Sequence, residues 1–233
     1  MRNPNPKNSE FLAKLECVRS LLDESDVEGL LIGKQANFSW LSCGGEAHVP
    51  LTSDVAAARL LVTKTDVHVI ASHIEMPRML DEALKSIKAT PHVFDWHAAN
   101  GARDAFRKIV DPKKVISDTG EWSSRNKPDL IAPLRWSFHP TEVRRYRDLG
   151  RDAEAAINAA CQTIEPEQTE FEIASHLSAC CWLLDLTPVV VLIAVDDRIR
   201  KYRHPLPTRK KLKDCAMLVL SARRQGQIVA LTR

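Results

Sequence analysis

The sequence predicts an α/β (α+β) protein made of two regions: a mixed-sheet α/β domain over residues 1–138 and a smaller domain over residues 139–233. Helical patterns alternate with short apolar strands throughout residues 1–138, which is typical of a compact α/β domain. His139-Pro140-Thr141 marks the boundary, because a proline disfavours helix at the residue before it and suits the first helical turn after it. The strongest helical pattern of the chain, residues 141–163, then opens the second domain.

The first domain begins with an amphipathic helix over residues 8–24, where apolar residues share one stripe and Asn8 or Ser9 caps the N-terminus. Gly29-Leu-Leu-Ile-Gly33 follows as a short buried strand between glycines. The further elements expected, in order, are strands at 58–63 and 67–71 that form a hairpin, a helix at 75–87, an extended segment at 92–96, a helix at 102–110, a strand at 114–117, a short helix at 127–133 and an extended segment at 135–138.

The second domain continues with a helix from Thr169 to about Leu184. Thr169 caps this helix, and Glu172, three residues later, completes a capping box with it. Residues 188–195 are a run of β-branched and apolar residues, which predicts a buried strand.

The last twenty residues predict a β-hairpin. Two short apolar strands, 216–222 and 227–232, are joined across Arg-Arg-Gln-Gly, and Gly226 can adopt the positive φ of a tight turn. A hairpin presents two side chains to one site when both lie on the same sheet face, and this depends on the register of the strands.

A polar segment lies between the strand and the hairpin, and it begins with Asp196 and Asp197. Adjacent side chains in extended structure point to opposite faces, so this pair does not form a shared carboxylate site. We expect the two aspartates to cap the turn or to pair with Arg198 or Arg200.

Composition excludes several classes of protein. The chain of 233 residues is 44% hydrophobic and 27% charged, with a net charge of +3 that is too small and too evenly spread to indicate a nucleic-acid partner. It has no apolar run long enough for a transmembrane helix and no secretory signal, so we expect no membrane association. The six cysteines include no C-x-x-C pair, which favours reduced thiols in a cytoplasmic protein.

Four segments of the second domain resemble one superfamily in order and spacing. They are Arg145-Tyr-Arg-Asp-Leu-Gly150, Pro166-Glu-Gln-Thr-Glu170, His204-Pro-Leu-Pro-Thr208 and Leu231-Thr-Arg233. Together they resemble the catalytic domain of the creatinase, aminopeptidase P and prolidase superfamily, the M24-like metallopeptidases with the pita-bread fold. The second of them looks like that family's P-G-x-T-E, with Gln168 near the usual glycine.

The first domain shows a matching resemblance. Gly29-Leu-Leu-Ile-Gly33, followed by Asn37-Phe-Ser-Trp-Leu41, is similar to the creatinase-type N-terminal domain. The resemblance covers essentially the whole chain. It implies a creatinase/prolidase-like N-terminal domain at 1–138, followed at 139–233 by the first half of a pita-bread domain that is apparently truncated.

The resemblance also implies a metal site and its positions. Active members hold two divalent metals, such as Mn, Co or Zn, with Asp, Asp, His, Glu and Glu, and the first two aspartates lie on the hairpin. Counting back from Thr232-Arg233 puts the second of these at Ala230 and the first at Val219. Neither side chain has a donor oxygen for a hard cation. We therefore expect no metal cofactor, and the remaining three ligands would lie beyond residue 233.

Three residues before the hairpin remain candidates for chemistry. The superfamily uses a histidine on this loop to contact substrate, and creatinase uses such a histidine for proton transfer without metal, so His204 is the candidate catalytic residue. Arg203 is a candidate for binding a substrate carboxylate. Typical members place the histidine seventeen residues before the first metal aspartate, where this chain has Tyr202, which makes Tyr202 a further substrate-binding candidate.

Three functional hypotheses follow. The first is an Xaa-Pro aminopeptidase/prolidase-like protein that has lost dimetal peptidase activity and serves in binding or regulation. The second is a metal-independent, creatinase-like hydrolase of a small amidino or amide substrate that uses His204. The third is an active Xaa-Pro peptidase, which requires a register different from the one placed at Val219 and Ala230. Expected partners are a second copy of the chain in a dimer and a peptide or small amide ligand.

Overall fold

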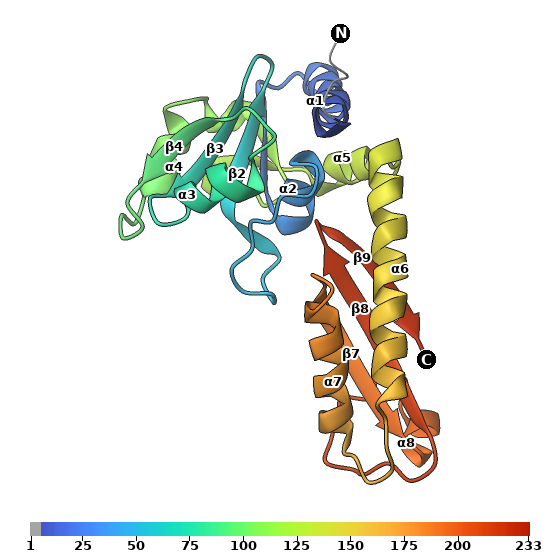
Figure 1. The fold of residues 1–233 in the computed structure, drawn as a ribbon. Helices are drawn as coiled ribbons and strands as arrows, with labels where there is room; N and C mark the ends of the chain where they lie inside the picture. Colours follow the sequence, from blue (N-terminus) through green and yellow to red (C-terminus); the bar gives the residue numbers. More distant parts are fainter. Residues whose placement is uncertain (1–5) are drawn as a thin grey trace. The chain divides into compact units, whose positions relative to one another are not determined.

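The computed structural model describes residues 6–233, with side chains from Asn8 onward. The chain divides into two compact units, Met1–Glu142 and Val143–Arg233, coloured from blue to yellow and from yellow to red in Figure 1. Helices and strands alternate along the chain and form one mixed and one antiparallel sheet, which confirms the α/β class. None of the helices within residues 6–233 combines the length and the apolar character needed to cross a membrane.

The first unit is built on a six-stranded mixed sheet with the strand order β4-β3-β2-β1-β5-β6. Strand β2 pairs antiparallel with both β1 and β3, whereas the pairs β1–β5, β5–β6 and β3–β4 are parallel. The strands are β1 (Gly29–Lys34), β2 (Val55–Thr63), β3 (Val67–Ser72), β4 (Thr90–Phe94), β5 (Val115–Ser117) and β6 (Arg125–Asn126).

One long helix and several short ones accompany this sheet. The α-helices are α1 (Pro6–Glu24), α2 (Gln35–Leu41), α3 (Met76–Arg78), α4 (Gly101–Arg107) and α5 (Pro128–Ile131), with a π-helical turn at Met79–Ala83 and 3-10 turns at Pro112–Lys114, Glu121–Ser123 and Ala132–Arg135. Arg135, expected in an extended segment, ends the last of these turns instead.

Both faces of the six-stranded sheet are covered at its central strands, whereas the edge strands β4 and β6 are largely exposed. Leu30 and Ile32 of β1 pack in a cluster with α1, whereas Leu31 between them packs on the opposite face with Phe106 of α4. Successive side chains of a strand point to opposite faces, so an unbroken apolar run suits a strand that is covered on both sides. The prediction of a buried strand here is confirmed, as is the hairpin of β2 and β3, in which Leu60 pairs with Val69.

The segment expected as one helix over 75–87 stops at Ala83. Its last turn is π-helical, since the Leu84 N–H donates at 2.8 Å to the carbonyl of Met79, five residues back. Gly45 packs against this turn so closely that a Cβ there would lie 2.0 Å from the carbonyl oxygen of Ala83. The local helical pattern carries no information on this contact between distant segments. The helix predicted over 75–87 is therefore too long.

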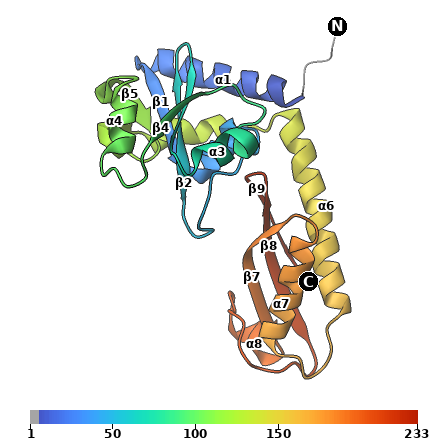
Figure 2. The ribbon, with the colours of Figure 1, turned by 60° about the vertical axis from the view of Figure 1, so that its left-hand side comes forward.

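The second unit packs two helices on one face of a three-stranded antiparallel sheet (Figures 1 and 2). The helices α6 (Pro140–Gln162) and α7 (Glu170–Trp182) both contribute to one apolar cluster with the sheet, whose order is β7-β8-β9. The strands are β7 (Thr187–Val195), β8 (Ala216–Arg224) and β9 (Gln227–Thr232). Their core-facing side chains include Ile193, Val195, Leu218, Leu220, Ala222 and Val229.

Local signals in this unit are confirmed. Thr169 and Glu172 form the expected capping box at the start of α7, with each side chain accepting from the other's backbone N–H. Gln225 and Gly226, both at positive φ, form the two-residue turn between β8 and β9. The segment expected as a loop after β7 contains a short helix, α8 (Asp197–Lys201), that the sequence pattern did not reveal.

Candidate functional site

Val219 and Ala230 lie on the same face of the β8–β9 hairpin. Ala230 pairs directly with Ser221, and Ser221 shares a face with Val219 because the two are two positions apart on β8. Val219 in turn pairs with Thr232 and, on its other side, with Leu192 of β7. The two positions are therefore diagonal neighbours on one surface, which settles the register question left open by the sequence.

This surface is the face of the sheet opposite α6 and α7. The helix-facing side chains alternate with it along each strand, and Val219 is half-buried while Ala230 is exposed. Its side chains, by register with Val219 and Ala230, are Val190, Leu192, Ala194, Met217, Val219, Ser221, Arg223, Ile228, Ala230 and Thr232. This set contains no carboxylate and no imidazole, so it holds no ligand of the kinds that divalent metals take in proteins.

The described residues outside this face also lack a group of side chains that could bind a metal ion. Within residues 6–233 no three His, Cys, Asp or Glu side chains are grouped so that they could hold an ion. A pair of divalent metals bound by five Asp, His and Glu ligands therefore does not fit the residues present on this face.

Tyr202, Arg203 and His204 are all exposed, directly after α8. Tyr202 stacks under the guanidinium of Arg198, whose Cζ lies 5.0 Å from the ring centroid. Across the part of the chain that the structure describes, the side chains of Arg203 and His204 form no hydrogen bond or ion pair. Their loop joins the end of β7 to the start of β8, at the end of the sheet opposite the Gln225-Gly226 turn.

Glu170 holds this loop in place. Its carboxylate is fully buried, and Oε2 accepts hydrogen bonds from the backbone N–H and the hydroxyl of Thr208 at 2.8 and 2.6 Å. Oε1 accepts from the backbone N–H of Val195 at 3.0 Å and from Nε of Arg198 at 2.8 Å. One carboxylate thus joins the end of β7, α8 and the loop that carries His204.

Asp196 organises the other side of the same connection. Its side chain accepts from the backbone N–H groups of Lys213, Asp214 and Cys215 at 2.9 to 3.2 Å. Hydrogen bonds from Asp214 and Cys215 are the main reason that the pKa of Asp196 is lowered. The side chain of Asp196 thus makes no cap hydrogen bond to the turn that it opens and binds the segment before β8 instead. Asp197 pairs with Lys201 and Lys210 rather than with an arginine.

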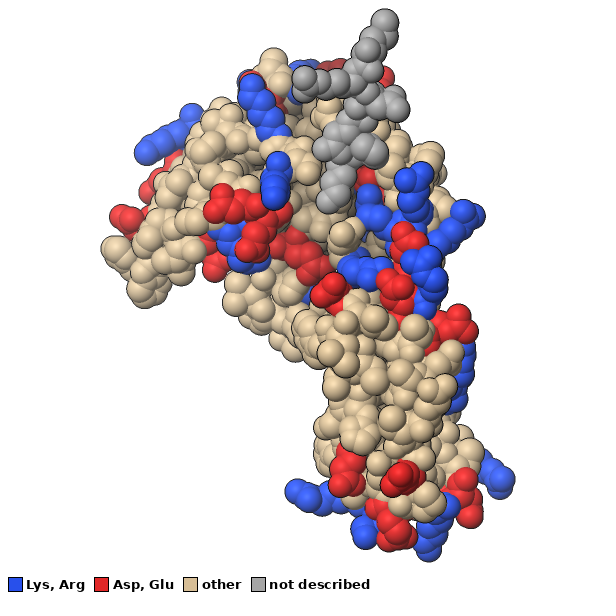
Figure 3. Space-filling model, in the orientation of Figure 1, with Lys and Arg blue, Asp and Glu red and all other residues tan. Residues whose placement is uncertain are grey.

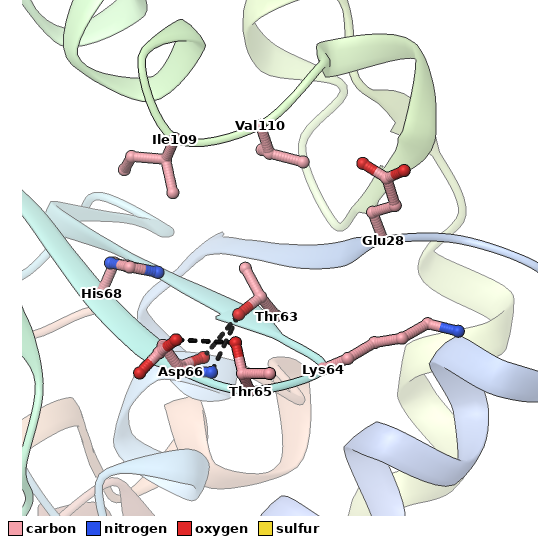
Figure 4. Close-up of a pocket in the computed structure, with 8 residues that line it drawn as sticks. All are labelled: Glu28, Thr63, Lys64, Thr65, Asp66, His68, Ile109 and Val110. Carbon is pink, nitrogen blue, oxygen red and sulfur yellow. Dashed lines mark hydrogen bonds between the residues drawn. The ribbon is translucent and has the colours of Figure 1, made fainter.

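The first unit contains a feature that sequence reasoning missed. Nδ1 of His68 on β3 lies 3.0 Å from Nε2 of His92 on β4, with the ring centroids 5.1 Å apart. Figure 4 shows His68 at the side of a cavity of about 410 Å³, with Asp66 beside it and Ile109 above it. Burial is the main cause that lowers the pKa of both histidines. Extended segments near both strands were expected from the sequence. Their parallel pairing was not, because a long connection separates them and no local sequence signal marks two such strands as neighbours.

No protein-family model and no curated protein matches the sequence. Solved structures do match in fold. The Xaa-Pro dipeptidase from Bacillus anthracis matches with a TM-score of 0.67 and 18% identity, over 96% of this chain and 64% of that one. The prolidase from Pyrococcus horikoshii OT3 matches with a TM-score of 0.71 and 17% identity, over 95% of this chain and 64% of that one.

A third similar structure is the N-terminal domain of the FACT complex subunit SPT16 from chickpea, Cicer arietinum. Its TM-score is 0.65 at 11% identity, over 97% of this chain and 66% of that one. The chain thus spans about 64% of the length of the first two solved structures. Across that span, it has the prolidase-like α/β fold, with a mixed-sheet unit followed by part of a pita-bread domain.

Proposed function

We propose that this chain is a prolidase-fold protein that does not carry out two-metal peptide hydrolysis and acts instead by binding. The observation that carries the proposal is the composition of the sheet face opposite α6 and α7. Val219 and Ala230, which occupy the positions that the resemblance assigns to two metal aspartates, lie side by side there, and no carboxylate or imidazole accompanies them. Apolar and hydroxyl side chains on such a face suit contact with a ligand or partner better than coordination of a hard cation.

The range of similar structures supports a binding role. The fold occurs in proteins described as an Xaa-Pro dipeptidase and a prolidase, and also in a domain described as part of a subunit of the FACT complex. One fold can serve unrelated functions when the site residues differ. We therefore infer the function from the residues on this sheet face and not from the fold.

The test is an assay for Xaa-Pro cleavage with Mn²⁺, Co²⁺ or Zn²⁺ supplied to metal-free protein, combined with elemental analysis after dialysis. We expect no metal-dependent cleavage and no Mn²⁺ or Co²⁺ retained at this face. Cleavage that requires added metal, at a rate that scales with protein concentration, contradicts the proposal.

A pair of double variants tests the face itself. Val219→Asp with Ala230→Asp places two carboxylates on diagonal positions of one surface, so Mn²⁺ affinity should rise. The matched control is Val219→Asn with Ala230→Asn, which has nearly the same shape but no charge and should bind Mn²⁺ much more weakly. Equal Mn²⁺ binding by the native protein and both variants excludes these two positions as a remnant metal surface.

A metal-free hydrolase that uses His204 is the second candidate. It is favoured by the exposed imidazole of His204, whose loop is held by the buried carboxylate of Glu170. If a small amide or amidino substrate is turned over, His204→Ala should abolish the activity while His176→Ala, a change at an exposed histidine of α7, should not. Unchanged turnover in His204→Ala rejects this role.

The proposal extends to the setting of the protein. All six cysteines are free thiols, which suits a reducing, cytoplasmic compartment.

Figure 3 shows a broad area of the second unit without Lys, Arg, Asp or Glu, and residues 173–184 carry none of these four. The exposed fractions of Phe171, Trp182 and Leu183 are 53%, 57% and 83%. Apolar exposure of this kind supports self-association, and sedimentation velocity of the native chain against Trp182→Ser with Leu183→Ser tests it.

A further inference from the structure

His68 and His92 form a close pair of chemically versatile side chains in the first unit that the proposed function does not use. His68 belongs to β3 and His92 to β4, and the two strands pair in parallel with His68 opposite Thr90 and Ile70 opposite His92. Residues two apart on a strand share a face, so both imidazoles lie on the same face of the sheet. Apart from their contact with each other, neither ring has a hydrogen bond or ion pair within residues 6–233.

The distance between the two ring nitrogens suits a shared metal ion as well as a hydrogen bond. Two imidazole nitrogens that bind one ion at about 2.05 Å each are about 2.9 Å apart if they subtend a right angle and about 3.3 Å apart if they subtend a tetrahedral angle. The observed separation of Nδ1 of His68 from Nε2 of His92 is 3.0 Å. It is near the right-angle value, the spacing of two adjacent positions in square-planar or octahedral coordination. The ring centroids lie 5.1 Å apart, so the two rings face each other nearly end to end, as their hydrogen bond requires, and both must turn for their lone pairs to converge on one ion.

The surroundings also suit a cation that keeps some water. The cavity of about 410 Å³ beside His68 is open to solvent and is lined by the carboxylate of Asp66. In Figure 4 Asp66 lies next to His68, while the side chain of Lys64 extends away from both. The ammonium of Lys64 pairs with Asp23 at 2.7 Å, so this positive charge is directed elsewhere. Ile109 and Val110 form the apolar wall on the other side.

We propose that His68 and His92 together bind a divalent transition-metal ion that prefers imidazole, such as Ni²⁺ or Cu²⁺, in two adjacent coordination positions. Water completes the coordination, and Asp66 supplies a compensating negative charge through space. The metal replaces the hydrogen bond between the rings. The ring that donated the hydrogen bond loses the proton from its facing nitrogen and takes up one on its other nitrogen, so each imidazole stays neutral and no proton is released overall. This site is independent of the proposed function of the sheet face in the second unit.

The test is titration of tag-free, full-length protein with Ni²⁺ by isothermal calorimetry at pH 8 in the presence of a non-thiol reductant. We expect one Ni²⁺ ion bound per chain. Replacing even a residue that only orients a metal ligand costs about 10–100-fold in affinity, so loss of a ligand in His68→Gln or in His92→Gln should weaken binding at least about tenfold. His176→Gln, at an exposed histidine of α7, is the matched control and should bind like the native protein.

Circular dichroism of each variant checks that its fold is retained. His92 lies on β4, one of the two edge strands of the sheet, so a change there disturbs the fold less than one at His68. Nuclear magnetic resonance of the imidazole protons gives a second readout that needs no variant. Sub-stoichiometric Ni²⁺ should broaden the signals of His68 and His92 before those of the other six histidines. Native affinity in His92→Gln, or broadening that begins at other histidines, overturns the proposal.

Discussion

Oε1 of Glu170 accepts a 2.8 Å hydrogen bond from Nε of Arg198, and the carboxylate that makes it is completely buried. Three further hydrogen bonds, from Val195 and Thr208, saturate the same carboxylate. The Pro166–Glu170 segment, which carries part of the family resemblance, therefore ends in a residue that supports the loop of Tyr202, Arg203 and His204. Its role in this chain is to position that loop.

Removing this carboxylate should destabilise the second unit strongly. Glu170→Ala leaves Arg198 and three other donors without their acceptor, and breaking a buried pair in this way costs about 3–5 kcal/mol. Urea unfolding followed by circular dichroism measures the loss. The control is Glu167→Ala, because Glu167 forms an exposed ion pair with Lys211 and should contribute less than about 1 kcal/mol. Equal losses in the two variants contradict this assignment.

The buried ammonium of Lys14 should be just as important to the first unit. Its Nζ donates to Glu10 at 2.7 Å, to Glu142 at 2.8 Å and to the carbonyl of Trp40 at 2.7 Å. Lys14→Met removes a buried ammonium that two buried carboxylates share, and we expect a loss of about 3–5 kcal/mol. Lys64→Met removes an exposed ion pair instead, and the urea midpoint should stay nearly unchanged. A Lys14→Met protein as stable as the native one disproves the prediction.

Acid should weaken the connection between β7 and β8 through Asp196. Backbone hydrogen bonds from Asp214 and Cys215 are the main cause that lowers the pKa of Asp196 in the folded chain. The unfolded chain therefore binds this proton more readily, so the stabilisation is present above the ordinary aspartate pKa, about 3.9, and is lost as the pH falls through the lowered folded value. Asp196→Asn should remove this part of the pH dependence.

The measurement for Asp196 is the urea midpoint between pH 6 and pH 2.5. The native protein should lose stability more steeply than Asp196→Asn below about pH 4. Asp129→Asn, a change at an exposed position of α5, should follow the native profile. Parallel profiles for the native protein and Asp196→Asn mean that these hydrogen bonds do not stabilise the folded state.

Thiol reactivity should separate the cysteines by burial. Desolvation, and to a lesser degree neighbouring Cys180, raises the pKa of Cys181 to about 11, and its side chain is fully buried. The thiolate is the reactive form, so at pH 8 iodoacetamide should label exposed Cys17 and Cys215 first and Cys181 only when the protein unfolds. Mass spectrometry of the labelled peptides over time gives the order. Early labelling of Cys181 in folded protein contradicts the packing of α7 against the sheet.

Local signals along the chain predicted most elements because their causes lie within a few residues. The capping box of Thr169 and Glu172, the Gly226 turn and the apolar run of β1 each depend on short-range hydrogen bonds or on strand alternation. The prediction of one helix over 75–87 was wrong because the cause of its early end lies far away in the sequence. The helix ends where Gly45, thirty or more residues earlier in the chain, packs against its last turn.

Sequence pattern was enough to establish the α/β class, the order of the main elements and the absence of donor oxygens at Val219 and Ala230, because residue identity and local periodicity carry that information. Only the tertiary structure decided that these two side chains share a sheet face, since strand register depends on pairing along the whole hairpin. It also decided that Nδ1 of His68 lies 3.0 Å from Nε2 of His92, because this contact depends on the parallel pairing of β3 and β4, which a long segment of chain connects. Contacts of this kind form only when the chain packs.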